Sequence, residues 1–188
     1  MKCAILRDSV RLTEKTKWQV VSVNFNWVRL ACVITLSKWA ARDWKGQTMN
    51  YKVKENQLSA NYVIALREIV GWGNSPIHQI EVALENSWYV MSVVHEGRVI
   101  GIGRIVGDGV TICYIQDVIV LPEYQGKGIG TAIMKHLIAH IRKNGFENTR
   151  ITIGLFAAKE KEDFYEKFGF YIRPNENRGA GMEMIMKI

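Results

Sequence analysis

A glycine-rich turn between an apolar strand and a helix is the part of the sequence best suited to chemistry. The turn runs from Gln125 to Thr131, follows a strand that ends before Pro122, and leads directly into a helical pattern. Amide groups at the start of a helix have no partner within the helix, and the helix dipole is positive there, so the turn can bind an anion such as a phosphate. Its glycines let the backbone approach a ligand closely, and Lys127 adds a positive charge.

Anion binding is one of two roles that this turn can have. It is not a P-loop, because no Gly-Lys-Ser/Thr follows at the required spacing, and the segment 126–130 lacks the glycine spacing of a dinucleotide fingerprint. The glycines can equally serve only to pack a strand tightly against a helix. The turn alone does not choose between anion binding and packing.

Two side chains outside the turn are candidates for proton transfer. Tyr165 lies in the aromatic run 164–170, where packing is the ordinary role of such side chains. A tyrosine hydroxyl, with a pKa of about 10, can also donate a proton in a reaction. Asp117 lies on the strand before the turn and can act as a base, directly or through water, or equally make a turn or helix-cap contact.

Two motifs in this order resemble one known family. The pattern Gln-x-x-Gly-x-Gly that starts at Gln125 is similar to the acetyl-CoA pyrophosphate loop of the GNAT N-acetyltransferase superfamily. One helix and one strand later, the pattern Tyr-x-x-x-Gly-Phe that starts at Tyr165 looks like the second signature of that family. The resemblance covers residues 49–188. It implies an α/β (α+β) fold of the GNAT type, a mixed and mostly antiparallel sheet flanked by helices, with acetyl-CoA as cosubstrate.

The resemblance also implies a role for each matching position. The backbone of strand residues 118–120 would pair with the pantetheine arm, and the loop amides would hold the pyrophosphate. Amides beside Val118 could stabilise the developing oxyanion, while Tyr165 would protonate the departing thiolate in a direct transfer within a ternary complex. The family often has an Asn where this chain has Ala158, so that side-chain contact is not expected. The residues expected to bind the cofactor are Val118, Ile119, Val120, Gln125, Gly126, Lys127, Gly128, Ile129, Gly130, Thr131 and Phe168.

The same resemblance locates the acceptor groove but does not identify the acceptor. It would lie between the turn 71–76 and the segment 173–182, where Trp72 could face an aromatic or sugar ring and Glu176 could attract an ammonium group. Either side chain can also be ordinary surface. A small primary amine of amino sugar, arylalkylamine or polyamine type is favoured over a protein N-terminus or a lysine side chain.

The spacing of apolar residues predicts the elements that must position these groups. Amphipathic periodicity predicts helices, and alternating or β-branched runs between turn residues predict strands. The three central strands are joined by short glycine turns, so they should be antiparallel. The predicted order is strand 50–56, helices 58–70 and 77–86, three strands within 88–122, helix 129–144, strand 149–156, helix 159–169 and strand 181–188.

The positive charge of the chain is concentrated in its first 48 residues. The chain has 25 Lys and Arg against 18 Asp and Glu, and the segment 1–48 holds nine of the former, three of the latter and four of the six Trp. We therefore predict a boundary at Met49, between a basic Trp-rich extension 1–48, in which 20–36 has strand character, and a domain over 49–188. The extension is expected to come from an upstream start. The alternative, from another functional class, is a basic arm that binds nucleic acid or an anionic surface.

Composition excludes several further classes. No apolar run approaches the ~18 residues of a membrane-spanning helix, and three scattered cysteines (Cys3, Cys32 and Cys113) exclude a disulfide framework and fit a reducing cytoplasm. His136 and His140 lack a third ligand, so we expect a solvated helix face and no metal. We expect a cytoplasmic acyltransferase with no membrane partner, no nucleic-acid partner and no metal, for which a homodimer would be unsurprising.

Overall fold

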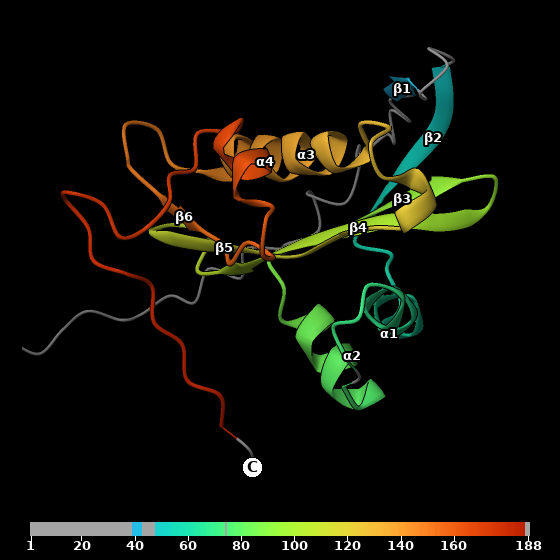
Figure 1. The fold of residues 1–188 in the computed structure, drawn as a ribbon, viewed down its shortest axis with the longest axis horizontal. Helices are drawn as coiled ribbons and strands as arrows, with labels where there is room; N and C mark the ends of the chain where they lie inside the picture. Colours follow the sequence, from blue (N-terminus) through green and yellow to red (C-terminus); the bar gives the residue numbers. More distant parts are fainter. Residues whose placement is uncertain (1–38, 43–47, 74, 187–188) are drawn as a thin grey trace, which may run out of the picture. The chain divides into compact units, whose positions relative to one another are not determined.

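The computed structural model describes residues 39–42, 48–73 and 75–186 (Figure 1). These residues form one mixed sheet with helices on its faces, so the predicted α/β fold class is confirmed. Most of the basic extension 1–48, including the strand predicted over 20–36, Cys3 and Cys32, lies outside the described residues. None of the helices among the described residues is long and apolar enough to cross a membrane.

The order of elements follows the predicted order closely up to the last strand. In chain order the elements are β1 (Trp39–Arg42), β2 (Thr48–Glu55), α1 (Ala60–Ile69), α2 (Ile77–Glu85), β3 (Tyr89–His95), β4 (Arg98–Gly107), β5 (Ile112–Val120), a 3₁₀ turn (Pro122–Tyr124), α3 (Ile129–Asn144), β6 (Thr152–Gly154) and α4 (Glu162–Glu166). Both β6 and α4 are shorter than their apolar patterns predict.

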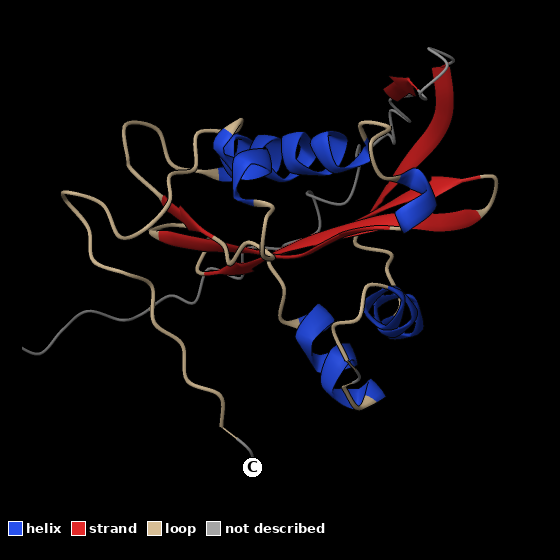
Figure 2. Cartoon of the chain, viewed as in Figure 1, coloured by secondary structure: helices blue, strands red, loops and turns tan. Residues whose placement is uncertain are grey.

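The six strands lie in the sheet in sequence order, β1 to β6. Neighbouring strands from β1 to β5 are antiparallel, whereas β5 and β6 are parallel and pair only over Ile112–Tyr114 and Thr152–Gly154. Figure 2 shows α3 and α4 on one face of the sheet and α1 and α2 on the other. Beyond Tyr114 and Gly154 the two strands are no longer paired. The edge of β5 is therefore open near the point where the glycine-rich turn leads into α3.

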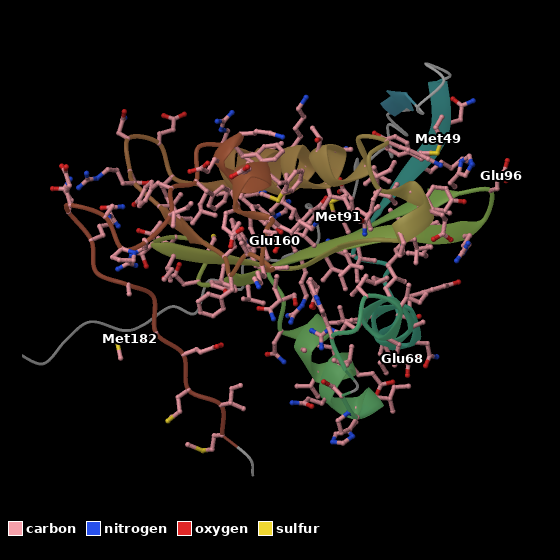
Figure 3. The ribbon with its side chains drawn as sticks, viewed as in Figure 1. Met49, Glu68, Met91, Glu96, Glu160 and Met182 are labelled. Carbon is pink, nitrogen blue, oxygen red and sulfur yellow. The ribbon has the colours of Figure 1, made fainter. Side chains whose placement is uncertain are left out.

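Burial along the strands shows which of them face the site. The side chains of β3 and β4 are buried along most of their length because helices cover both faces; Met91, labelled in Figure 3, is fully buried. Strand β5 instead alternates, so that Ile115, Asp117 and Ile119 are buried while Gln116 and Val118 are only partly covered. One face of β5 thus remains accessible to a ligand.

Helix α3 approaches β4 unusually closely at two glycines. A Cβ atom at Gly103 would lie 2.7 Å from Cγ2 of Ile133 and 3.1 Å from Cδ1 of Leu137, and one at Gly101 would lie 3.0 Å from Cδ1 of Ile133. Because Ile133 and Leu137 are fully buried, neither can swing away easily. These contacts therefore fix the distance between α3 and the sheet.

The interpretation of His136 and His140 as a solvated face is wrong. His140 stacks on Tyr89 of β3, with ring centroids 3.9 Å apart, and Trp88 packs edge-on against it. Burial lowers the pKa of both histidines, which favours their neutral form. No group of three metal-binding side chains occurs among the residues that the structure describes.

The two ends of the described fold differ from the predicted strands. Strand β1 lies within the predicted extension and pairs with β2 from Trp39↔Tyr51 to Arg42↔Thr48. The change in charge at Met49 thus falls within β2. At the other end, residues 181–186 form no strand, and Met182, labelled in Figure 3, is 92% exposed.

Replacing Gly103 by Ala should destabilise the fold because its methyl group would collide with buried side chains of α3. We expect the free energy of unfolding to fall by about 1–3 kcal/mol, the usual cost of overpacking, as measured by urea denaturation. Gly179→Ala is the matched control, since no atom lies within 4 Å of its Cβ position. Equal stability of the two variants would contradict the close contact.

Candidate active site

The site is built around an irregularity in β5. Ile102 pairs with Ile119 and Arg104 pairs with Gln116, so the single residue Gly103 faces two residues, Asp117 and Val118. Such a β-bulge interrupts the ladder and redirects the backbone. Asp117 has φ +53°, a left-handed conformation that is uncommon for a residue with a side chain.

The other edge of β5 is open over the same residues. Pairing with β6 ends at Tyr114, so among the described residues no strand pairs with 115–120 on that side. Backbone groups on an open strand edge can bind an extended ligand as a further strand would bind. These residues include 118–120, which the sequence motifs predict as the strand that pairs with the cofactor.

The glycine-rich turn begins where this open edge ends. Gly126 and Gly128 have φ +72° and +81°, and Gly128 is the N-cap of α3. The first helical hydrogen bond runs from the amide of Ala132 to the carbonyl of Gly128 at 2.9 Å, so the preceding amides at the helix start have no acceptor within the helix. The Gln125 side chain donates from Nε2 to the carbonyl of Val120 at 3.0 Å, which ties the turn to the strand.

Two further contacts define the walls of this turn. The Lys127 ammonium lies 5.2 Å from the centroid of the Tyr124 ring, a cation–π distance. A Cβ at Gly130 would lie 3.2 Å from the Phe164 ring of α4. Glycine at 130 therefore lets α4 and the aromatic run 164–170 approach the start of α3.

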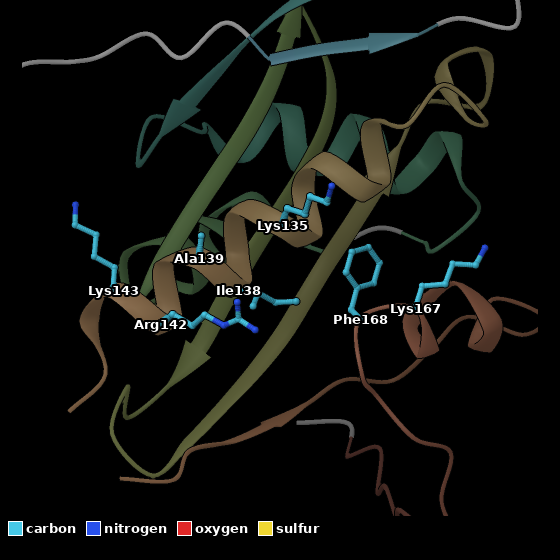
Figure 4. Close-up of a pocket in the computed structure, with 7 residues that line it drawn as sticks. All are labelled: Lys135, Ile138, Ala139, Arg142, Lys143, Lys167 and Phe168. Atoms are coloured by element: carbon cyan, nitrogen blue, oxygen red, sulfur yellow. The ribbon is translucent and has the colours of Figure 1, made fainter. Parts of the chain in front are cut away.

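A basic groove runs along α3 toward the end of α4 (Figure 4). It has a volume of about 610 Å³, and the described residues that line it include four cationic side chains and no acidic one. They are Lys135, Ile138, Ala139, Arg142, Lys143, Lys167 and Phe168. Of these residues, the sequence motifs predicted only Phe168. Lys135 and Arg142 lie seven residues apart on one helix and so share a face, a spacing that indicates a basic surface from the sequence alone.

A smaller cavity of about 100 Å³ lies on the other side of the open edge. It brings together four of the residues expected at the catalytic centre or the acceptor site: Trp72, Asp117, Val118 and Tyr165. The remaining lining residues are Tyr114, Ile115, Gln116, Leu155, Phe156 and Ala158. The residues of this cavity come from β5, the segment after β6, α4 and the connection between α1 and α2.

Two tyrosines meet in this cavity. Burial raises the pKa of Tyr165 and of Tyr114 above the ordinary value, so both hydroxyls stay protonated and able to donate at neutral pH. The Tyr114 hydroxyl is buried, and its ring packs edge-on against Phe156. Tyr114 was not anticipated from the sequence, where it appears as one more residue of an apolar strand.

Asp117 is held between two guanidinium groups. Nη2 of Arg67 lies 2.7 Å from Oδ1 and 2.8 Å from Oδ2, and Nε of Arg104 lies 2.6 Å from Oδ2. Both carboxylate oxygens are therefore occupied by charged donors. In this geometry the carboxylate of Asp117 joins the last turn of α1 to β4.

Glu176 is the one expected site residue that lies apart from the others. It is exposed, in the turn closed by the Asn175↔Arg178 bridge, and it does not line either the cavity or the basic groove. Trp72 thus lines the small cavity, whereas Glu176 does not. The segment 173–182, from which Glu176 was chosen, is exposed throughout.

Comparison with known proteins agrees with this geometry. Residues 84–172 match the family model described as Acetyltransferase (GNAT) domain. The chain is 31% identical over 136 residues to the uncharacterized N-acetyltransferase ycf52 of Pyropia yezoensis, covering 67% of this chain and 76% of that protein. A crystal structure of a protein of unknown function from meticillin-resistant Staphylococcus aureus, described as "Probable Acetyltransferase", is 31% identical with a TM-score of 0.64, covering 72% of this chain and 99% of that one.

Two further relatives have names that specify an acceptor. The chain is 35% identical over 122 residues to serotonin N-acetyltransferase 2, chloroplastic, of Oryza sativa subsp. japonica, and 34% identical over 127 residues to histone acetyltransferase TAP1 of Glycine max. Each alignment covers 61% of this chain, but only 59% and 53% of the respective relatives. Taken with the fold and the open strand edge, these matches show that the chain belongs to the GNAT family of N-acetyltransferases, whose members use acetyl-CoA as the acetyl donor.

Proposed function

We propose that this protein transfers the acetyl group of acetyl-CoA to a small primary amine with an aromatic or apolar body. The observation that carries the proposal is the small cavity in which the bulge of β5, Tyr165 and Trp72 meet beside an open strand edge. A donor on one side of that edge and an amine in the cavity would approach each other at Val118.

The residues on the donor side fit an acetyl-CoA molecule. The open edge at 118–120 offers backbone groups to an extended arm, and the start of α3 offers unpaired amides to a pyrophosphate. The basic groove beyond it supplies four cations for further phosphate. Val118, Ile119 and Val120 would therefore hold the arm, and residues 125–131 the pyrophosphate.

Two kinds of group of the chain would act in the reaction, backbone amides and the Tyr165 hydroxyl. Acetyl-CoA, when bound, supplies an acetyl thioester. Backbone amides at the bulge beside Val118 would donate to the carbonyl oxygen as negative charge develops on it, an effect worth ~3–4 kcal/mol in comparable sites. The Tyr165 hydroxyl, kept protonated by burial, would donate its proton to the sulfur.

The lining of the cavity supports an aromatic or apolar amine over the other candidates. Trp72, Tyr114 and Phe156 supply aromatic surface, and the only carboxylate among the described lining residues, that of Asp117, is already paired with Arg67 and Arg104. A polyamine would need unpaired carboxylates to replace the hydration of its charges. Serotonin is an arylalkylamine, so the name of the rice relative agrees with this choice.

A lysine side chain of a protein is the second candidate acceptor, because one relative is named as a histone acetyltransferase. A lysine would enter the cavity, whose volume is about 100 Å³, by its narrow end, so the volume is compatible with this acceptor. We also propose that the protein is cytoplasmic and that it forms a homodimer.

Acetyl-CoA should bind in the absence of acceptor, with a dissociation constant measurable by isothermal titration. Gly128→Val should weaken binding by about tenfold or more, because a β-branched side chain is strained at φ +81° and would displace the amides at the start of α3. Gly97→Val is the matched control, since Gly97 has the same φ in a turn between β3 and β4. Equal loss in both variants would indicate general strain, and no binding by the wild type would refute the proposed function.

Tyr165→Phe should lower kcat by ~10²-fold, the usual contribution of a general acid, while the dissociation constant for acetyl-CoA stays the same. Because burial raises the pKa of Tyr165, the wild-type rate should not fall on the alkaline side until the pH exceeds the ordinary tyrosine value of about 10. Tyr171→Phe, at an exposed tyrosine, is the control. Unchanged turnover in Tyr165→Phe would remove the residue from the mechanism.

A panel of acceptors distinguishes the amine classes. Phenethylamine and tryptamine should give the highest kcat/KM, and glucosamine and spermidine at least about tenfold lower values, because they lack aromatic surface to bury against Trp72. Release of free thiol from acetyl-CoA is the readout. A lysine peptide that outperforms both arylalkylamines would assign the protein acceptor instead.

A further inference from the structure

We propose that Asp117, Arg67 and Arg104 form a positioning clamp that holds the acceptor wall against the reacting strand. The acceptor wall is the pair of helices α1 and α2 with the connection 70–76 that carries Trp72. The inference rests on the proposed function, since it assigns to these residues the placement of the acceptor. It gives Asp117 a role other than that of a base.

The clamp joins three elements through one carboxylate. Arg67, in the last turn of α1, makes a bidentate contact with Asp117 of β5, with Nη2 at 2.7 and 2.8 Å and Nε at 3.1 Å from the carboxylate oxygens. Arg104 of β4 contacts the same carboxylate at 2.6 Å, and its Nη1 donates to Oγ of Ser87 at 3.1 Å, just beyond the end of α2. A bidentate guanidinium–carboxylate pair fixes orientation as well as distance.

Arg67 also connects the clamp directly to the cavity. Its backbone carbonyl accepts the amide hydrogen of Trp72 at 2.9 Å. The same residue therefore anchors the Trp72 backbone through its main chain and Asp117 through its side chain. A shift of Arg67 would move one wall of the cavity relative to the strand that forms the opposite wall.

Apolar packing alone holds the acceptor wall weakly. Helix α1 buries three side chains completely and α2 buries only Ile80, whereas α3 buries six. The side chains of the clamp are well shielded: Asp117 is 3% exposed, Arg104 10% and Arg67 15%. A buried ion pair is a poor source of net stability compared with apolar residues of the same size, so what the clamp contributes is a defined position.

The clamp also bears on the bulge that presents the backbone to the donor. Asp117 has φ +53°, a conformation that persists in a residue with a side chain only when its surroundings enforce it. The two guanidinium groups provide that enforcement at the residue next to Val118. The acceptor wall and the amides expected to stabilise the carbonyl oxygen are thus positioned by the same contact.

The test compares Asp117→Asn, Arg67→Met and Arg67→Lys with the exposed Arg98→Met as control. We expect the KM for phenethylamine to rise about tenfold or more in Asp117→Asn and Arg67→Met, as a small misplacement of the acceptor predicts. Arg67→Lys, which keeps the charge but not the bidentate geometry, should fall between Arg67→Met and the wild type. In the two Arg67 variants, which leave the bulge residue Asp117 in place, the dissociation constant for acetyl-CoA and the shape of the pH–rate profile should be those of the wild type.

Each contrary result has a distinct meaning. Loss of the acidic limb of the pH–rate profile in Asp117→Asn, with KM unchanged, would make Asp117 the base and overturn the clamp. A lower melting temperature with unchanged KM would reduce the cluster to a structural contact. If Asp117→Asn fails to fold, Arg67→Lys carries the same test.

Hydrogen exchange gives a readout that does not depend on activity. In Arg67→Met the amides of α1 and α2 should exchange about tenfold faster, while those of α3 stay protected, because only the acceptor wall is released. Unchanged exchange in α1 and α2 would overturn the clamp whatever the activity. Failure of the wild type to bind acetyl-CoA would instead refute the proposed function and leave the exchange result to decide the clamp.

Discussion

The pairing of β5 differs on its two sides, and the rest of the site depends on that difference. Toward β4 the strand is paired along most of its length, with one bulge opposite Gly103, whereas toward β6 it is paired only at its first three residues. Backbone hydrogen-bonding groups on a sheet are normally covered by a neighbouring strand, so an open edge inside a domain is a place for a ligand. The glycine-rich turn begins where this edge ends, and residues 115–118 of the edge line the small cavity.

The two sides of the site are held by different kinds of interaction. On the donor side, α3 is fixed by six buried side chains and by close contact with glycines of β4. On the acceptor side, the few buried side chains of α1 and α2 are supplemented by the contacts that Arg67 and Arg104 make with Asp117. Burial of apolar surface is nondirectional, while a bidentate ion pair is strongly directional. Each side therefore has the type of contact that suits what it must keep in place.

Local patterns in the sequence indicated the elements on the donor side. A glycine-rich turn was expected to lead into a helix, and in the structure Gly128 has φ +81° and is the N-cap of α3. Tyr165 was expected near the reacting strand on the strength of its motif, and it lines the cavity with Val118. These features depend on residues that are neighbours in the chain, which is why a sequence pattern can carry them.

Features that depend on distant residues were not predicted. Arg67 and Asp117 are 50 positions apart, so no local pattern links them. An arginine in the apolar middle of β4 nevertheless indicated that Arg104 needs a buried partner. Glu176 was chosen for its charge and position in the family pattern, and it lies on an exposed turn. The strand expected over 181–188 has suitable residues but no partner among the described residues, and strand propensity without pairing does not form a strand.

The separation of the two walls has a consequence for how such a site can diversify. The connection 70–76 and the outer faces of α1 and α2 carry exposed residues, among them Trp72, Ile77 and Val82, that no core contact restricts. Substitutions there can reshape the opening through which an amine enters, while the depth of α3 and the geometry of the glycine-rich turn stay as they are. As long as Arg67 still contacts Asp117, the acceptor specificity can change without a loss of acetyl-CoA binding. The helix pair α1 and α2 is therefore the region to alter when the enzyme is redesigned for new amines.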